Sequence, residues 1–249
     1  MIPLKSKQDL EMLRESGRKL GKILQLLCEF VKIGVTTAQI DCLAEELVIE
    51  EGALPAFKGY RGFPASICTS LNEEIVHGIP GPRILEENDI LSLDIGVNYK
   101  GFFTDAAVTL PIGKINPKTE KLICVARQAL YEGIKQAKAQ NQLYDISHSI
   151  QRHAEENGFS VVRQFVGHGI GAKLHEEPEI PNFGQPHQGP LLKNGMVLAI
   201  EPMVNMGSWE AEIKENGWTA VTKDGLPSAH FEHTVAITEE GPQILTAYA

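Results

Sequence analysis

No stretch of the 249-residue chain approaches the roughly 18 to 20 consecutive apolar residues that a membrane-spanning helix needs, and its start, MIPLKSKQDL, has no long apolar segment typical of a signal peptide. We therefore expect a cytoplasmic protein. Only four cysteines are present, widely separated and without a C-x-x-C pair. Neither a disulfide framework nor a thiolate zinc site is indicated.

Basic runs are absent as well, and the net charge is -9 with a pI near 5.4. This composition disfavours a nucleic-acid binder, because such proteins gather lysine and arginine along the phosphates. With 43% hydrophobic residues, the chain is long enough to bury a full core, either as one large domain or as two small ones.

Four helices are predicted, in two pairs. Their apolar residues recur at helical spacing, and end signals frame them: Ser6 and Asn116-Pro117 open the first and third, while Gly52 and Gly158 stop the second and fourth. The predicted ranges are 6–28, 37–51, 116–139 and 145–158. Strand-like segments follow each pair.

The chain contains an internal echo. At a constant offset of 106, residues of the second helix recur in the fourth, and at an offset of 107 ILSLD (90–94) matches VLAIE (197–201). The recurring helical residues are Ile40, Ala44, Val48, Glu50 and Gly52 with Ile146, Ile150, Ala154, Glu156 and Gly158. Coincidence is the alternative, since helix-helix-strand order is common. Duplication predicts one α/β catalytic domain, 1–249, with pseudo-repeats of about 6–113 and 114–249 joined about a pseudo-twofold axis.

The segment 90–110, ILSLDIGVNYKGFFTDAAVTL, is predicted to form a buried β-hairpin. If Tyr99 and Lys100 form a two-residue loop, Asp94 lies directly opposite Asp105. A three-residue loop with a bulge at Gly101 would instead shift the pairing by one residue. Two like charges facing each other destabilise a hairpin, so we expect something positive between them.

Four carboxylates should converge where the two repeats meet, because Asp94 aligns with Glu201 and Asp105 with Glu232. Desolvation and repulsion disfavour four charged carboxylates in one place unless cations are bound. His168, between glycines in VGHGIG, is the fifth candidate ligand. Such a set suits two ions of Mn(II), Fe(II) or Co(II), with zinc as a further alternative, and two neighbouring ions can activate water. Each residue alone is more simply an edge, turn or core residue.

These residues resemble those of a known family. The segments FPASICTSLNEEIVHGIPG, LSLDIGVNYKGFFTDAAVTL, GHGIGAKLHEEPEIPNF, NGMVLAIEPM and HFEHTVAIT are similar to those of type I methionine aminopeptidases, the bacterial form, over nearly the whole chain. The resemblance implies the pseudo-symmetric pita-bread α/β fold with a curved antiparallel sheet. It also implies hydrolytic removal of the initiator methionine from nascent chains whose second residue is small.

The resemblance assigns roles to single residues. Asp94 would bind one ion, Asp105 and Glu232 would bridge both, and His168 and Glu201 would bind the other. Glu201 would also act as general base for a metal-activated water. His175 would steady the developing oxyanion, and His77 would contact the scissile amide nitrogen.

The family's methionine pocket corresponds to Tyr60, Phe63, Cys68, Leu174 and Trp218. Core packing is the alternative for these residues, and for Phe63 or Leu174 alone it is an equally good explanation. The chain departs from some relatives at Phe57, where they have a cysteine, and at Leu174, where others have an aromatic residue. Asn72 and Ser228 fall where some relatives hold a monovalent cation.

Two alternatives stay open. The first is an aminopeptidase P or prolidase on the same fold, which usually carries an additional N-terminal domain, whereas this chain begins directly with the first helix. The second is a catalytically inactive pita-bread protein that binds partners, a class that typically loses metal ligands. The expected partners are nascent polypeptide N-termini, with transient ribosome association, no nucleic-acid or membrane role, and a monomeric state.

Overall fold

The computed structural model describes residues 2–247. Within them, four α-helices and a short 3-10 helix form: α1 (Lys7–Phe30), α2 (Thr37–Glu50), η1 (Tyr60–Gly62), α3 (Pro117–Gln136) and α4 (Leu143–Glu156). Capping boxes start α1 at Ser6 and α2 at Thr36, and Asn116 caps α3 ahead of its first residue, Pro117. No helix of the described residues is long and apolar enough to cross a membrane.

The predicted helices are all present, but some ends differ. Helix α1 continues to Phe30 rather than stopping near Cys28, and α3 ends at Gln136, before Ala139. The prediction that α4 begins at Asp145 is wrong, because α4 begins at Leu143. Asp145 is its third residue, and its carboxylate accepts a hydrogen bond from the backbone N–H of the cap residue, so the acid marks the helix start from inside.

Within residues 2–247, nine strands form one antiparallel sheet, and two smaller sheets have three strands each. The path of the large sheet is β1-β4-β5-β14-β9-β7-β8, with β2 added to β4 and β15 to β14. Its strands are β1 (Leu54–Pro55), β2 (Cys68–Leu71), β4 (Ile90–Tyr99), β5 (Phe102–Pro111), β7 (Val166–Gly169), β8 (Glu176–Pro181), β9 (Val197–Ile200), β14 (Glu232–Thr238) and β15 (Gly241–Ile244). The small sheets contain β6 (Ser160–Val161), β10 (Met203–Asn205) and β13 (Ser228–His230), and β3 (Glu74–Val76), β11 (Ala211–Ile213) and β12 (Ala220–Thr222).

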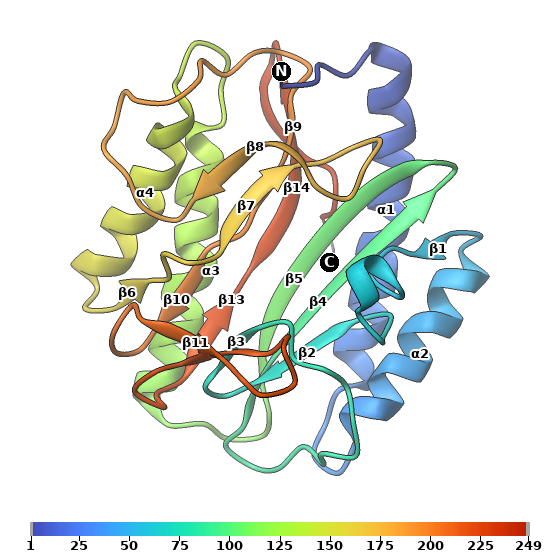
Figure 1. Ribbon diagram of the computed structural model, residues 1–249, viewed down its shortest axis with the longest axis vertical. Helices are drawn as coiled ribbons and strands as arrows, with labels where there is room; N and C mark the ends of the chain where they lie inside the picture. The colour runs from blue at the N-terminus through green and yellow to red at the C-terminus, as the bar shows by residue number, and fades with distance from the viewer. Residues whose placement is uncertain (1, 248–249) are drawn as a thin grey trace.

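The order of the large sheet reflects the sequence echo. Strands β4 and β5 come from the first half, β9 and β14 come from the second, and β5 pairs with β14 where the halves meet. The helices lie behind this sheet, α1 and α2 on one side and α3 and α4 on the other (Figure 1). The opposite face of the sheet is therefore left uncovered by the helices.

Side-chain alternation along β4 separates these two faces. Leu91, Leu93, Ile95 and Val97 belong to the main core, which they share with helix residues. Asp94 lies between them in the sequence and so points to the opposite face. Helix residues therefore cover the side of this strand that is opposite Asp94.

The turn of the β4–β5 hairpin differs from the prediction. It falls on Lys100 and Gly101, since Tyr99 pairs with Phe102. A two-residue hairpin loop of the favoured type requires positive φ at both positions, and Lys100 has a φ of 51° and Gly101 of 87°. The Asn98 side chain accepts a hydrogen bond from Gly101 N at 2.9 Å, which stabilises this loop.

As a consequence, the prediction that Asp94 lies directly opposite Asp105 is wrong. Asp94 pairs with Ala107, and Asp105 pairs with Gly96. The register has moved by two residues rather than one, so both carboxylates remain on the same face, as diagonal neighbours.

Candidate active site and metal centre

Four neighbouring strands, and the residue that directly follows a fifth, β9, each place one potential metal ligand on the face away from the helices. In register, Asp94 lies opposite Ala107, which in turn lies opposite Glu232. On the other side of the seam, His168 lies opposite Ala199 of β9. Asp105 lies two residues before Ala107, and Glu201 lies two residues after Ala199. Because side chains two residues apart in a strand point the same way, all five side chains lie on one face. Across the sheet, the ligand set follows the order Asp94, Asp105, Glu232, Glu201 and His168.

The distances show that these side chains converge. One ligand atom each from Asp105, His168 and Glu232 lies within 4.8 Å of the others. Nε2 of His168 lies 3.5 Å from Oε1 of Glu201. Nδ1 of His168 is 2.9 Å from the backbone oxygen of Gly169, to which it donates, so Nε2 keeps its lone pair for a metal.

Burial and mutual repulsion dominate the electrostatics of this cluster. Desolvation raises the pKa of Asp105 to about 7 and raises the pKa of Asp94, Glu201 and Glu232 well above the usual range, with repulsion between the acids adding to it. Desolvation lowers the pKa of His168 to about 4, so its imidazole is neutral at pH 7. Without cations, the site thus favours protonated acids.

Three buried carboxylate oxygens accept no hydrogen bond from any of residues 2–247: Oδ1 of Asp94, Oδ1 of Asp105 and Oε1 of Glu232. Leaving such atoms unsatisfied costs free energy. Divalent cations would satisfy all three and would remove the repulsion at the same time. The residues present therefore fit a site for divalent metal ions.

The cluster lies in a cavity of about 310 Å³. All the residues that the sequence analysis assigned to metal, catalysis or the methionine pocket line this cavity: Tyr60, Phe63, Cys68, His77, Asp94, Asp105, His168, Leu174, His175, Glu201, Trp218 and Glu232. Phe57 lines it too. The structure thus brings together charged ligands and an apolar wall, which is the arrangement that a site for a small apolar side chain next to a metal requires.

Aromatic contacts shape the apolar wall and its mouth. The rings of Phe63 and Trp218 meet edge to face, with centroids 5.2 Å apart. Tyr60 stacks on His175 at 5.2 Å, and its hydroxyl lies 3.0 Å from His175 Nδ1. Desolvation, with the nearby His168, lowers the pKa of His175 to about 3. His175 is therefore a neutral imidazole whose orientation the tyrosine fixes.

His77 enters the cavity from an unusual backbone conformation. Its φ is 59°, in the left-handed region that residues other than glycine rarely adopt. Its ring meets Phe165 edge to face at 5.7 Å, and burial lowers its pKa. A strained backbone at a cavity wall is typical of a functional residue.

Several residues at this site are absent from the sequence predictions, and His230 and Phe165 contact predicted residues directly. His230 is 1% exposed, and its Nε2 lies 3.7 Å from Oε2 of Glu201. Its position two residues before Glu232 in HFEH could have indicated it. Phe165, the aromatic neighbour of His77, gives no such signal, because a single phenylalanine near a strand usually belongs to the core.

Comparison with known proteins identifies the family. Residues 11–239 match the model of metallopeptidase family M24. The chain belongs to this metallopeptidase family. A protein named methionine aminopeptidase from Clostridium perfringens is 52% identical over 246 residues, which covers 99% of each chain. The crystal structure of a methionine aminopeptidase from Thermotoga maritima superposes on this M24 chain with a TM-score of 0.98 at 44% identity, covering 99% of this chain and 100% of that one.

The likeness in fold extends further within M24. A prolidase from Pyrococcus furiosus has a TM-score of 0.81 at 22% identity, and this chain covers only 66% of it. At that identity the likeness concerns the fold alone. The predicted pita-bread α/β fold is thereby confirmed, and the aminopeptidase prediction is supported over its prolidase alternative.

Proposed function

We propose that this M24 chain is a methionine aminopeptidase that removes the initiator methionine when the second residue is small. The observation that carries the proposal is the cavity itself, in which five metal-ligating side chains adjoin an apolar aromatic pocket. Relatives named methionine aminopeptidase match the chain at 50 to 52% identity over nearly its full length. An inactive binding protein would have no need to retain the whole ligand set.

Two divalent ions, of manganese, iron or cobalt with zinc as the alternative, would be held by Asp94 on one side, by His168 and Glu201 on the other, and by Asp105 and Glu232 between them. When bound, such ions lower the pKa of water, so that hydroxide is available at neutral pH, and they polarise a carbonyl group. The unsatisfied carboxylate oxygens and the neutral His168 support this assignment.

Glu201 is suited to moving a proton. With cations beside it the Glu201 carboxylate would be ionised, so that it could accept a proton from water and return it to the leaving amine. His175, if its Nδ1 accepts from the Tyr60 hydroxyl, carries its proton on Nε2 and can donate to the developing oxyanion. His77 would contact the scissile amide nitrogen.

The methionine side chain would occupy the pocket of Tyr60, Phe63, Cys68, Leu174 and Trp218. All five line the cavity, and Cys68 pairs across the sheet with Asp94, which places the apolar pocket directly beside the metal ligands. Burial raises the pKa of the Cys68 thiol, so it remains neutral and acts as an apolar wall.

The cellular setting belongs to the same proposal. The substrates would be nascent polypeptide N-termini, because the free amino group of a chain end must reach the metals. The proposal also places the enzyme in the cytoplasm, as a monomer that associates transiently with the ribosome. Endopeptidase activity is not expected.

A monovalent cation beside Asn72 and Ser228 is a further part of the proposal. The two residues adjoin, since Ser228 N donates to Asn72 O at 2.8 Å. The Ser228 hydroxyl lies 2.8 Å from Oδ1 of Asn205. Carbonyl and hydroxyl oxygens of this kind are the ligands that hard cations prefer.

A peptide panel tests the proposed function. With Mn(II) or Co(II), the protein should release methionine from Met-Ala-Ser and not from Met-Leu-Ser, because the proposed function requires a small second residue. Chelation should abolish the release. Equal activity on a Gly-Pro substrate would instead indicate a prolidase, and no activity on any peptide would indicate a binding protein.

Replacing His77 by alanine separates substrate contact from metal binding. We expect His77→Ala to lower kcat roughly 100-fold, as loss of a transition-state contact does, while the metal content measured by mass spectrometry stays unchanged. His187→Ala, at a side chain that is 86% exposed, serves as the control. A metal-free His77→Ala protein would show that His77 is a ligand instead.

A further inference from the structure

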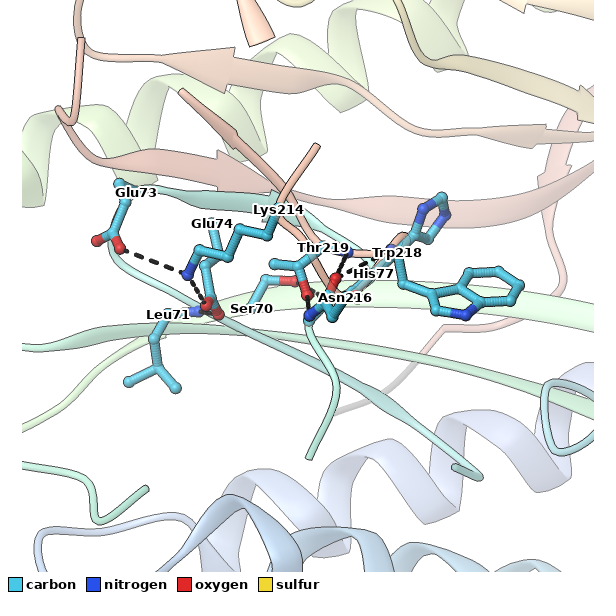
Figure 2. A network of polar contacts seen from close by, with 10 residues as sticks. Ser70, Leu71, Glu73, Glu74, His77, Lys214, Asn216, Trp218 and Thr219 are labelled. Atoms are coloured by element: carbon cyan, nitrogen blue, oxygen red, sulfur yellow. Dashed lines mark hydrogen bonds and ion pairs between the residues drawn. The ribbon is translucent and has the colours of Figure 1, made fainter. Parts of the chain in front are cut away.

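The loop between β11 and β12 reaches two cavity residues through one chain of hydrogen bonds (Figure 2). Oδ1 of Asn216 accepts from the backbone N–H groups of Trp218 and Thr219, both at 3.0 Å. Its Nδ2 donates to the Thr219 hydroxyl at 2.8 Å. That hydroxyl donates in turn to the backbone oxygen of His77 at 3.3 Å.

The backbone at His77 is held from two sides. On the side of the first half, Gly78 N donates to Ser70 Oγ at 3.1 Å, and Thr69 N donates to Gly78 O at 2.8 Å. The approach is so close that a Cβ on Gly78 would lie 2.2 Å from Thr69 O. The Thr219 hydroxyl completes the enclosure from the second half. A left-handed residue such as His77 persists only where its surroundings fix it in this way.

The loop is itself anchored to the same part of the structure. Lys214 N donates to Thr219 O at 2.9 Å, which closes the loop. The Lys214 ammonium lies 2.7 Å from Oε1 of Glu74, whose other oxygen accepts from Leu71 N (Figure 2). Because the Lys214 side chain is 39% exposed, this ion pair stabilises the structure only weakly, and the partly buried hydrogen bonds of Thr219 carry more of the order.

We propose that Thr219 and Asn216 are positioning residues that fix His77 and Trp218 at the cavity wall, a role that rests on the proposed aminopeptidase function. Thr219 is 2% exposed, so its hydroxyl has no water to replace His77 as acceptor. Asn216 fixes the backbone of Trp218, whose ring packs on Phe63. One loop thereby couples the group at the scissile amide to the wall of the methionine pocket.

Paired substitutions at Thr219 test this role. Thr219→Val keeps the shape and removes the hydroxyl, and it should lower kcat for Met-Ala-Ser about tenfold while KM changes less than about twofold. Thr219→Ser keeps the hydroxyl and should restore kcat. Asn216→Ala should both lower kcat and raise KM, because it releases Trp218 as well as Thr219.

Thr222→Val is the matched control. Thr222 lies on the adjoining strand β12 and is 3% exposed, but its hydroxyl donates to Leu226 O at 2.7 Å, away from the cavity. Its loss should leave kcat unchanged. The proposal is overturned if kcat falls equally in Thr219→Val and Thr222→Val, or if Thr219→Ser has the same low kcat as Thr219→Val. Either result would mean that the loss of kcat reflects a general loss of stability.

A second readout does not depend on catalysis. In the metal-free protein, the NMR resonance of the His77 ring should move in Thr219→Val, because Phe165 lies edge-on to that ring at 5.7 Å, and should stay in place in Thr219→Ser and Thr222→Val. If the wild type releases no methionine, the proposed function is wrong and the resonance still tests the positioning. An unmoved resonance in Thr219→Val overturns the positioning role alone.

Discussion

Asp94→Asn is expected to lower turnover of Met-Ala-Ser by roughly a thousandfold, because a ligand that loses its charge lowers metal occupancy and with it the supply of hydroxide. The fold should survive. Asparagine keeps the shape of the side chain, and it removes a buried acid whose pKa is raised by desolvation and by Asp105. The metal-free variant should therefore be at least as stable as the metal-free wild type.

Metal analysis, steady-state kinetics and thermal unfolding measure the metal occupancy, the turnover and the stability of this variant. Glu179→Gln is a suitable control, since Glu179 pairs with His168 across β7 and β8 but is exposed to solvent. It should change neither metal content nor turnover. Wild-type turnover in Asp94→Asn would rule out its role as a ligand, and an unfolded variant would show that the carboxylate is needed for the fold itself.

The hairpin shows how far the sequence could predict geometry. The predicted pairing implied that Asp94 and Asp105 lie on the same face of the hairpin, and they do, because sharing a face depends only on the period of two. The register depends on which residues accept positive φ. Lys100 has a φ of 51° here, and the amino-acid sequence does not show that a lysine at this position adopts a positive φ. Because the predicted register was wrong by two residues, both acids still lie on one face, but each pairs with a different residue from the one predicted.

The candidate site was predictable for a different reason. No single acid indicates a metal, but the sequence echo aligns Asp94 with Glu201 and Asp105 with Glu232, and the pairing of β5 with β14 brings these pairs together. Residues outside the echo were predictable only in part: His168 was indicated by its flanking glycines, and His230 could have been found two residues before Glu232. Thr219 matters through where the folded chain places it, against the backbone of His77, and no local pattern encodes that contact.

The metal-free protein should lose stability as the pH rises from about 6.5 to 8.5. In the folded state the pKa of Asp105 is raised to about 7 and the pKa values of Asp94, Glu201 and Glu232 are raised well above normal, mainly by desolvation. In the unfolded chain these acids are ionised throughout this range. The folded state thus binds more protons, and each such carboxyl costs about 1.4 kcal/mol of stability per pH unit until it ionises.

Histidines act in the opposite direction, but at lower pH. Desolvation lowers the pKa of His168 and His233 to about 4 and of His175 and His230 to about 3. In the unfolded chain, histidine has a pKa of about 6.5 and binds a proton below that pH, whereas these buried histidines stay neutral in the folded state. The unfolded state therefore gains protons, and stability falls, as the pH drops below about 6.5. Well above pH 6.5 the histidines are neutral in both states, so the carboxyls dominate the slope. Burial raises the pKa of the Cys28 thiol to about 11 and that of Cys68 well above its usual range, which lowers stability in the same direction near pH 8.5.

Urea unfolding in the presence of EDTA, at several pH values across this range, measures the slope directly. Added Mn(II) should flatten or reverse it, because metal binding requires ionised carboxylates and therefore strengthens as the pH rises. Asp94→Asn should reduce the slope by the share of one carboxyl, whereas Glu179→Gln should leave it unchanged. If the metal-free wild type gained stability with rising pH, the buried acids would be ionised without metal, and repulsion could no longer explain why the site binds cations.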